Sequence, residues 1–317
     1  MNKGYRVGIA GYGVVGRGIH RLLKDDIECI FDPFVSDDTI YEIHSIYDIH
    51  GTDPRIKRRQ EDFKGMDVSI VSVMTKANDD GTCDTSIVEE TVKWLSTINP
   101  KGVILIKSAI VPSKVRELVR TYPKAKIVVS PEYMGESKYF TPFWKYPDPQ
   151  NMESHTWQIF GSDNKEWSSL CIDIFKRRMS VDTIQLQTTL MTAALTKYME
   201  NNFFAMKVTF CNEWYDIAQR YGVDYNELRE CWLADTRINR NHTLVFPKDR
   251  GYGGKCFPKD VRAFFRWAEE VGLHADMCRA ADKVNDRVRD IEDWKAIKGA
   301  TSTNDYEEEK KVGEDNG

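Results

Sequence analysis

The chain has 317 residues, of which 41% are hydrophobic and 30% are charged, and its formal net charge is −4. This length accommodates two domains with separate cores, and the composition is ordinary for a globular protein. The small negative charge argues against binding to nucleic acid or to an anionic membrane, and no apolar run approaches the length of a membrane span.

The N-terminal residues predict a dinucleotide-binding unit. Residues 5–10 have the apolar character of a buried parallel strand, and a helical pattern begins after residue 16. Between them lies a glycine fingerprint, which is strong evidence only in this strand–helix context. Asp32 ends the next apolar stretch, about 20 residues beyond the first glycine, where such folds place the acid that binds the adenosine ribose and favours NAD over NADP. The alternative for Asp32 is a turn residue before Pro33. The fingerprint consists of Gly11, Tyr12, Gly13, Val14, Val15 and Gly16.

Alternating strands and helices continue to about residue 186. This alternation predicts an α/β domain of the Rossmann type, a doubly wound parallel sheet with helices on both faces, over residues 1–186. The expected strands are residues 68–73, 103–107, 127–129 and 156–161, and the expected helices are residues 85–95, 113–120 and 167–178.

Polar residues follow three of these strands at their carboxyl ends, the edge where such sheets bind ligands. Thr75 and Ser108 are candidates for cofactor binding, with helix capping as the alternative for both. Glu132, with Glu136 four residues further on, is a candidate general base toward water, and a solvated loop acid is its alternative. Residues 138–152 read as a loop over the site.

From about residue 188 the apolar period becomes that of a helix for some thirty residues. Further helices are expected at residues 225–234, 261–271 and 276–297, so residues 187–298 form an all-helical domain, and 299–317 read as a disordered acidic tail. Lys197 and Asn201 share one face of the long helix and could stabilise an oxyanion, whereas a snorkelling lysine beside a surface amide is the alternative.

The run Gly251-Tyr252-Gly253-Gly254-Lys255-Cys256-Phe257-Pro258-Lys259-Asp260 is the most informative stretch. Its glycines allow positive φ and close approach of the backbone to a ligand. Cys256 falls at or near a helix N-terminus, where the helix dipole and a nearby ammonium favour the thiolate. A small buried hydrophobe is the alternative for a lone cysteine, but this polar setting favours a nucleophile.

The seven cysteines are scattered and include no CxxC pair. They indicate neither a disulfide framework nor a zinc site, so we predict no metal centre. Reduced thiols are typical of the cytoplasm, which is the location that we expect.

Taken together, these motifs resemble the nucleotide-sugar 6-dehydrogenases, of which UDP-glucose 6-dehydrogenase is the best-known type. The resemblance covers roughly residues 5–290, and the Gly251–Asp260 run is its most specific part. The other matching pieces are Gly11–Gly16, Asp32, Met74-Thr75 with Asp84-Thr85-Ser86, Lys107-Ser108, Ser130-Pro131-Glu132 with Glu136, Lys197–Asn201, Asn212-Glu213 and Asp235–Ile238.

The resemblance implies oxidation of a primary alcohol on a nucleotide sugar, most simply UDP-glucose, to a carboxylate with two NAD. It implies a homodimer formed through the helical domain. The implied catalytic residues are Cys256 as nucleophile, Lys197 and Asn201 for the oxyanion, Glu132 for the hydrolytic water and Asp260 for proton transfer. The implied cofactor-binding residues are Gly11–Gly16, Asp32, Thr75, Ser108, Glu136 and Lys259, and the implied substrate-binding residues are Glu132, Glu136, Lys197, Asn201, Arg237 (reaching a neighbouring subunit's site), Gly251, Gly253 and Gly254.

This chain departs from the family pattern at two places. Ala109 stands where the family usually has a threonine that helps to position water or cofactor, and from residue 290 onward we expect no second α/β domain of the kind that in the family binds much of the nucleotide. Two other functions stay open. The first is a dehydrogenase of a smaller hydroxylated substrate, which would need no cysteine. The second is a non-catalytic NAD-binding subunit that assembles with a partner.

Overall fold

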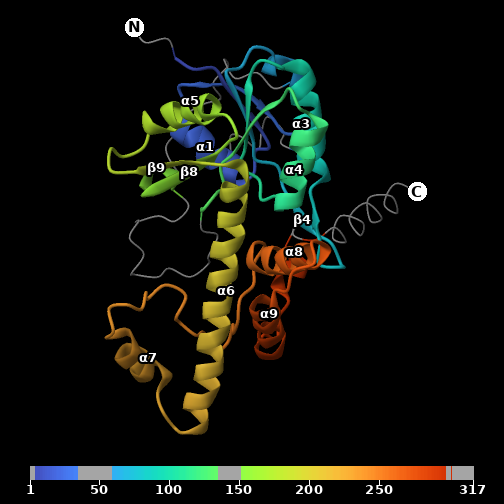
Figure 1. The fold of residues 1–317 in the computed structure, drawn as a ribbon. Coiled ribbons are helices and arrows are strands. Elements are labelled where there is room, and N and C mark those ends of the chain that lie inside the picture. Colours follow the sequence, from blue (N-terminus) through green and yellow to red (C-terminus); the bar gives the residue numbers. More distant parts are fainter. Residues whose placement is uncertain (1–3, 35–58, 135–150, 298–300, 302–317) are drawn as a thin grey trace, which may run out of the picture. The chain divides into compact units, whose positions relative to one another are not determined.

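A computed structural model describes residues 4–34, 59–134, 151–297 and 301 of the chain. They fall into two compact units (Figure 1). The first lies within Met1–Thr75, Thr85–Gly135 and Asp148–Ala194, and the second within Lys76–Asp84, Glu136–Pro147 and Leu195–Gly317. Glu136, most of the expected loop at 138–152 and the tail from residue 302 lie outside the described residues. In the part of the chain described, no helix has the length and apolarity needed to cross a membrane.

The first unit is built on a seven-stranded sheet with the order β2-β1-β3-β6-β7-β8-β9. The predicted Rossmann-type fold is confirmed, although β8 runs antiparallel to β7 while the other pairs are parallel. Apart from the edge strand β9, the strands are short, mostly apolar runs that are largely buried, as in other parallel sheets. Their bounds are β1 Val7–Ala10, β2 Ile27–Phe31, β3 Val68–Val71, β6 Val103–Ile106, β7 Lys126–Val129, β8 Trp157–Gly161 and β9 Ile184–Thr188.

Helices cover both faces of this sheet (Figure 1). Helices α1 (Val14–Leu23) and α5 (Lys165–Lys176) pack in one apolar cluster, and α3 (Ser86–Ile98) and α4 (Pro112–Thr121) pack in the other. Strand β1 lies between β2 and β3, so the strand order reverses there. Sheets of this type bind ligands at such a reversal, beyond the carboxyl ends of the strands, and the glycine fingerprint follows β1 at this point.

The second unit is helical apart from the hairpin of β4 (Lys76–Ala77) and β5 (Cys83–Asp84). Helix α6 (Leu190–Arg220) contributes its first turn to the first unit and then packs with α7 (Tyr225–Leu233) through one cluster and with α8 (Phe257–Glu270) and α9 (Asp276–Val288) through another. Short 3-10 turns cover Gln60–Phe63, Met152–Ser154 and Asp293–Ala296.

Two sequence-based expectations about elements were wrong. Strand β9 was not expected, because its alternation of polar and apolar residues is short and its exposed edge position leaves most of it in solvent. The helix expected over residues 276–297 ends at Val288, and Arg289 takes an extended backbone conformation. The Arg289 guanidinium is buried in ion pairs with Asp249 and Asp293, each at 2.9 Å, and these contacts stabilise the turn of the chain.

Candidate functional site

The glycine fingerprint lies between β1 and α1, as predicted. Gly11 has φ +92°, and a Cβ there would lie 2.6 Å from the amide nitrogen of Val73. A Cβ at Gly16 would lie 2.1 Å from the carbonyl oxygen of Gly11. In contrast, Gly13 faces open space and precedes α1 without a side-chain cap. The first N–H groups of α1 therefore remain available to an anion, which is how such turns hold a pyrophosphate.

Asp32 makes the local turn contact that the sequence suggested as an alternative, and it also contacts the glycine fingerprint. Its Oδ1 accepts a hydrogen bond from the N–H of Phe34 at 2.9 Å, which is the local turn. Its Oδ2 accepts from the N–H of Tyr12 at 2.7 Å, which ties the end of β2 to the fingerprint. A carboxylate offers about four acceptor positions, so Asp32 keeps capacity for ribose hydroxyls.

The remaining described cofactor candidates of the first unit are polar residues after β3 and β6. The Ser108 hydroxyl donates to the carbonyl of Val73 at 2.7 Å, so it ties two neighbouring strand ends together. Thr75 is half-buried and is the last residue of the first segment of the first unit. Their cofactor-binding roles stay predictions.

Glu132 is not a solvated loop acid, because its side chain is only 8% exposed. Its Oε1 accepts hydrogen bonds from the N–H groups of Tyr133 (2.8 Å) and Met134 (3.1 Å), and its Oε2 lies 3.0 Å from Nζ of Lys107. Nδ1 of His155 lies 3.8 Å from Oε1. Burial acts to raise the pKa of Glu132, but Lys107, His155 and the hydrogen bonds outweigh it and lower the pKa.

The interpretation of the sequence missed the role of Lys107 in this cluster. The Lys107 side chain is fully buried, and Nζ lies 3.3 Å from both Oγ of Ser130 and Oε1 of Gln158. An ionisable residue directly after a buried apolar strand was the available signal, because a buried ammonium needs partners. His155 gave no comparable signal.

In the second unit, Cys256 is exposed and is the N-cap residue of α8, with no side-chain hydrogen bond in its capping position. The predicted position at a helix N-terminus is confirmed. The dipole of α8 favours a thiolate there. The structure therefore contradicts the alternative in which Cys256 is a small buried hydrophobe.

Helices α6 and α8 also bring three predicted residues together, one turn along α8 from the cysteine. Nδ2 of Asn201 donates to Oδ2 of Asp260 at 2.6 Å, and Nζ of Lys259 lies 2.6 Å from Oδ1 of Asp260. All three side chains are buried. Burial acts against the charge of Lys259, but the Asp260 carboxylate outweighs it and raises the pKa of Lys259. The Lys259–Asp260 ion pair thus orients the Asn201 amide.

Lys197 stands one turn before Asn201 on α6 and is half-buried. Burial raises the pKa of Glu200, and the positive charge of Lys197 opposes this increase. Tyr198, which follows Lys197, is buried, and its hydroxyl makes no hydrogen bond to a residue that the structure describes.

The glycines before Cys256 differ in their surroundings. A Cβ at Gly251 would lie 2.3 Å from Oδ1 of Asn285, and one at Gly253 would lie 2.3 Å from Oδ1 of Asp293. These two glycines let the loop pack against residues that follow α8. Gly254 has φ +72° and faces open space, so it is the glycine whose backbone a ligand can approach.

Arg237, predicted to reach a neighbouring subunit, projects into solvent with its side chain 88% exposed. Its guanidinium pairs with Asp235, which also accepts a hydrogen bond from the backbone N–H of Arg237. The pair holds the guanidinium against the loop that follows α7.

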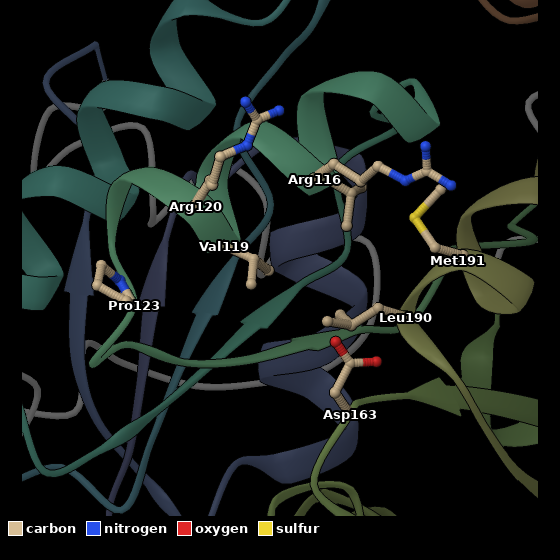
Figure 2. A pocket seen from close by; sticks show the side chains of 8 residues that line it. Arg116, Val119, Arg120, Pro123, Asp163, Leu190 and Met191 are labelled. Atoms are coloured by element: carbon tan, nitrogen blue, oxygen red, sulfur yellow. The ribbon is translucent and has the colours of Figure 1, made fainter.

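A shallow cavity of about 450 Å³ on the first unit contains none of the predicted site residues. Figure 2 shows side chains from α4 and from the start of α6 around it. Its lining is Val115, Arg116, Val119, Arg120, Pro123, Asp163, Leu190 and Met191. Among the described residues, no group of three or more His, Cys, Asp or Glu side chains is arranged to hold a metal ion.

Comparison with known proteins identifies relatives. Residues 191–287 match the UDP-glucose/GDP-mannose dehydrogenase family, central domain. A UDP-glucose 6-dehydrogenase of Rickettsia typhi is 30% identical over 230 residues, which are 71% of this chain and 50% of that protein. One of Pseudomonas aeruginosa is 26% identical over 242 residues, which are 73% of this chain and 51% of that protein. The chain thus spans about half the length of the curated relatives that it matches.

Two solved structures share the fold. A UDP-glucose dehydrogenase from Pyrobaculum islandicum has a TM-score of 0.73 and 24% identity, with 90% of this chain and 68% of that chain covered. A GDP-mannose dehydrogenase from Pseudomonas aeruginosa has a TM-score of 0.60 and 22% identity, with 89% and 69% covered. With the sequence matches, they confirm the resemblance predicted from the motifs.

Proposed function

Because this chain is a relative of the nucleotide-sugar dehydrogenases, we propose that it oxidises the C6 primary alcohol of a nucleotide sugar to a carboxylate. UDP-glucose is the proposed substrate and NAD the proposed cofactor. The observation that carries this proposal is the exposed Cys256 at the N-terminus of α8, one turn before the buried Asn201–Asp260–Lys259 cluster. A hydroxyacid-type dehydrogenase has no use for this thiol.

The first unit has groups that fit NAD. The free N–H groups at the start of α1 and the open side of Gly13 suit a pyrophosphate, and Asp32 keeps acceptor capacity for ribose hydroxyls. NAD, when bound, supplies the hydride acceptor. Thr75, Ser108, Glu136 and Lys259 are proposed as further cofactor contacts.

Cys256 is proposed as the nucleophile of the second oxidation. Loss of a hydride and the hydroxyl proton converts the alcohol to an aldehyde. The thiolate then forms a bond to the carbonyl carbon, and the carbonyl oxygen becomes an alkoxide that is protonated to give a thiohemiacetal. Loss of a second hydride and of the hydroxyl proton from this adduct leaves a thioester on Cys256.

Asn201 and Lys197 are proposed to stabilise the oxyanion. The Asn201 amide has two N–H donors, of which one is used by Asp260. The second can donate to a substrate oxygen in the orientation that Asp260 maintains. Asp260, predicted to take part in proton transfer, therefore has at least a positioning function toward Asn201. Lys197 would add the positive charge.

Glu132 is proposed as the base for the last step, in which water attacks the thioester carbon and the C–S bond breaks. The products are the carboxylate and the regenerated thiolate. The lowered pKa of Glu132 keeps the carboxylate ionised at neutral pH, as a base must be.

A homodimer is also proposed, and α6 supports it. Large apolar side chains on this helix are exposed at steps of three, four and seven residues, so they form one stripe. A stripe of this extent is typical of a protein interface. Arg237 would then contribute to the neighbouring subunit's substrate site. The loop of Gly251, Gly253 and Gly254 would contribute to its own subunit's site, with the open backbone at Gly254 as its point of contact. The stripe consists of Leu195, Met199, Phe203, Phe210, Trp214 and Ile217.

The test is a panel of nucleotide sugars offered to the chain with NAD, with NADH measured by absorbance. We expect NADH and a uronate from UDP-glucose. Cys256→Ser should abolish net acid formation, because an alkoxide is a poor leaving group compared with a thiolate. The matched control Cys231→Ser changes the other exposed cysteine that the structure describes and should keep full activity. Clear NAD binding without turnover of any sugar would instead favour a non-catalytic subunit.

A further inference from the structure

The two oxygens of the Glu132 carboxylate have different surroundings. Two backbone N–H groups, from Tyr133 and Met134, occupy Oε1 at 2.8 and 3.1 Å. Oε2 is buried and lies 3.0 Å from Nζ of Lys107, but it accepts no well-angled hydrogen bond from any described residue. Each carboxylate oxygen has about two acceptor positions. Oε1 is therefore filled, whereas Oε2 keeps an acceptor position that no described residue uses.

Lys107 has little freedom to move away from this position. An ammonium has three donors, and three acceptors surround Nζ: Oε2 of Glu132, Oγ of Ser130 and Oε1 of Gln158. The stem of the side chain is fully buried, and Nζ lies 5.4 Å from the centre of the Phe175 ring. The ion pair is therefore a fixed part of the first unit.

The described charged and titratable groups around the pair are few. His155 faces Oε1 of Glu132, and the thiol of Cys171 faces Lys107. Burial raises the pKa of Cys171, so that this thiol carries no charge at neutral pH. Desolvation disfavours an ionised Glu132, and Lys107 supplies the nearest full positive charge that opposes it.

We propose that Lys107 is a positioning residue of the hydrolytic step, because it holds the Glu132 carboxylate ionised and oriented so that Oε2 receives the proton of the attacking water. This inference rests on the proposed function, in which Glu132 is the base. It assigns Lys107 a role separate from substrate and cofactor binding.

The experiment compares Lys107→Gln with Lys126→Gln, which changes a half-buried lysine at the opposite end of the neighbouring strand. Pre-steady-state NADH formation reports the oxidation steps, and steady-state turnover reports thioester hydrolysis. In Lys107→Gln we expect the pre-steady-state burst of NADH to be unchanged. The pH below which the hydrolysis rate falls should move up by about 1–3 pH units, the range for loss of one opposite charge. At pH values below this point, each pH unit of the shift means about tenfold slower hydrolysis. Lys126→Gln should have the same NADH burst and the same pH dependence of hydrolysis as the unmodified chain.

Two further measurements separate this role from a purely structural one. The first measurement uses the double variant Lys107→Met/Glu132→Gln, which removes both charges. Its hydrolysis should be no slower than that of Glu132→Gln alone, because Lys107 acts through Glu132.

The second measurement is an infrared difference titration of the Glu132 carboxyl, whose signal is assigned by its loss in Glu132→Gln. In Lys107→Gln the titration midpoint should show the same upward shift. This reading needs no turnover, so it stands even if the proposed substrate is wrong. An unchanged pH dependence of hydrolysis, an unmoved infrared titration, or a double variant slower than Glu132→Gln would overturn the proposal.

Discussion

At the scale of single residues, Gly251 and Gly222 have nearly the same backbone conformation, with φ of +71° and +68°. Their surroundings differ. A Cβ at Gly251 would lie 2.3 Å from Oδ1 of Asn285, whereas nothing lies within 4 Å at Gly222. Asn285 also accepts from the N–H of Tyr252 at 2.7 Å and donates to its carbonyl at 3.1 Å. The loop before Cys256 is therefore held against α9 by an amide that needs a glycine beside it.

We predict that Gly251→Ala destabilises the chain more than Gly222→Ala does. Positive φ costs a non-glycine residue about 1–2 kcal/mol at either position. At Gly251 the alanine must also displace Asn285, and the loss of its hydrogen bonds adds about 1 kcal/mol or more. Urea unfolding of the two variants checks this difference. Equal losses would show that the Asn285 contact adapts without cost.

At the scale of elements, α6 combines two tasks along its length. One face is buried against α8 and α9, and it carries Asn201 toward Asp260. The apolar stripe on α6 remains exposed, with Met199 at 78% and Phe203 at 56%. Exposing such a row of side chains is unfavourable at about 25 cal/mol per Å² of apolar surface, which is the physical basis for the proposed dimer.

The dimer can be tested with a charge in the stripe. Phe210→Glu should shift the chain from dimer to monomer in sedimentation velocity, because a carboxylate buried at an interface without a partner is strongly unfavourable. Val181→Glu is the matched control, since Val181 is 97% exposed in the first unit, outside α6. The proposed interface is wrong if both variants sediment alike.

At the scale of the whole molecule, the free energy of unfolding depends on pH, because folding buries groups that the unfolded chain would protonate. His242 stacks on Phe204, with ring centres 4.1 Å apart, and also faces Phe257. Burial first, and then the positive charge of Lys207, lower the pKa of His242 from 6.5 to about 4. The unfolded chain binds this proton more readily, so the free energy of unfolding decreases as pH falls from 6.5 toward 4.

The corresponding prediction concerns His242→Asn. Asparagine accepts the positive φ of 62° found at this position, and it does not titrate. The unmodified chain should lose on the order of 3 kcal/mol between neutral pH and pH 4 through this group. The variant should lack that part of the slope in urea unfolding curves measured at several pH values. His274→Asn, which changes an exposed histidine, should keep it.

By itself, the sequence determined those features that depend on residues close together in the chain. The fingerprint between a strand and a helix, the buried strands and the position of Cys256 at the start of α8 all follow from local periodicity and glycine placement. A Rossmann-type unit followed by helices could be predicted from these patterns, because each depends on neighbours in the chain.

Only the tertiary structure decided which candidates share an environment. Asn201 and Asp260 are 59 residues apart, and no spacing rule pairs them. Glu132 has the same local sequence whether it is solvated or buried, and its burial against Lys107 results from packing between adjacent strands. The end of α9 at Val288 likewise depends on the distant Asp249. Long-range contacts select among conformations that local sequence leaves close in energy, so they appear only once the chain is folded.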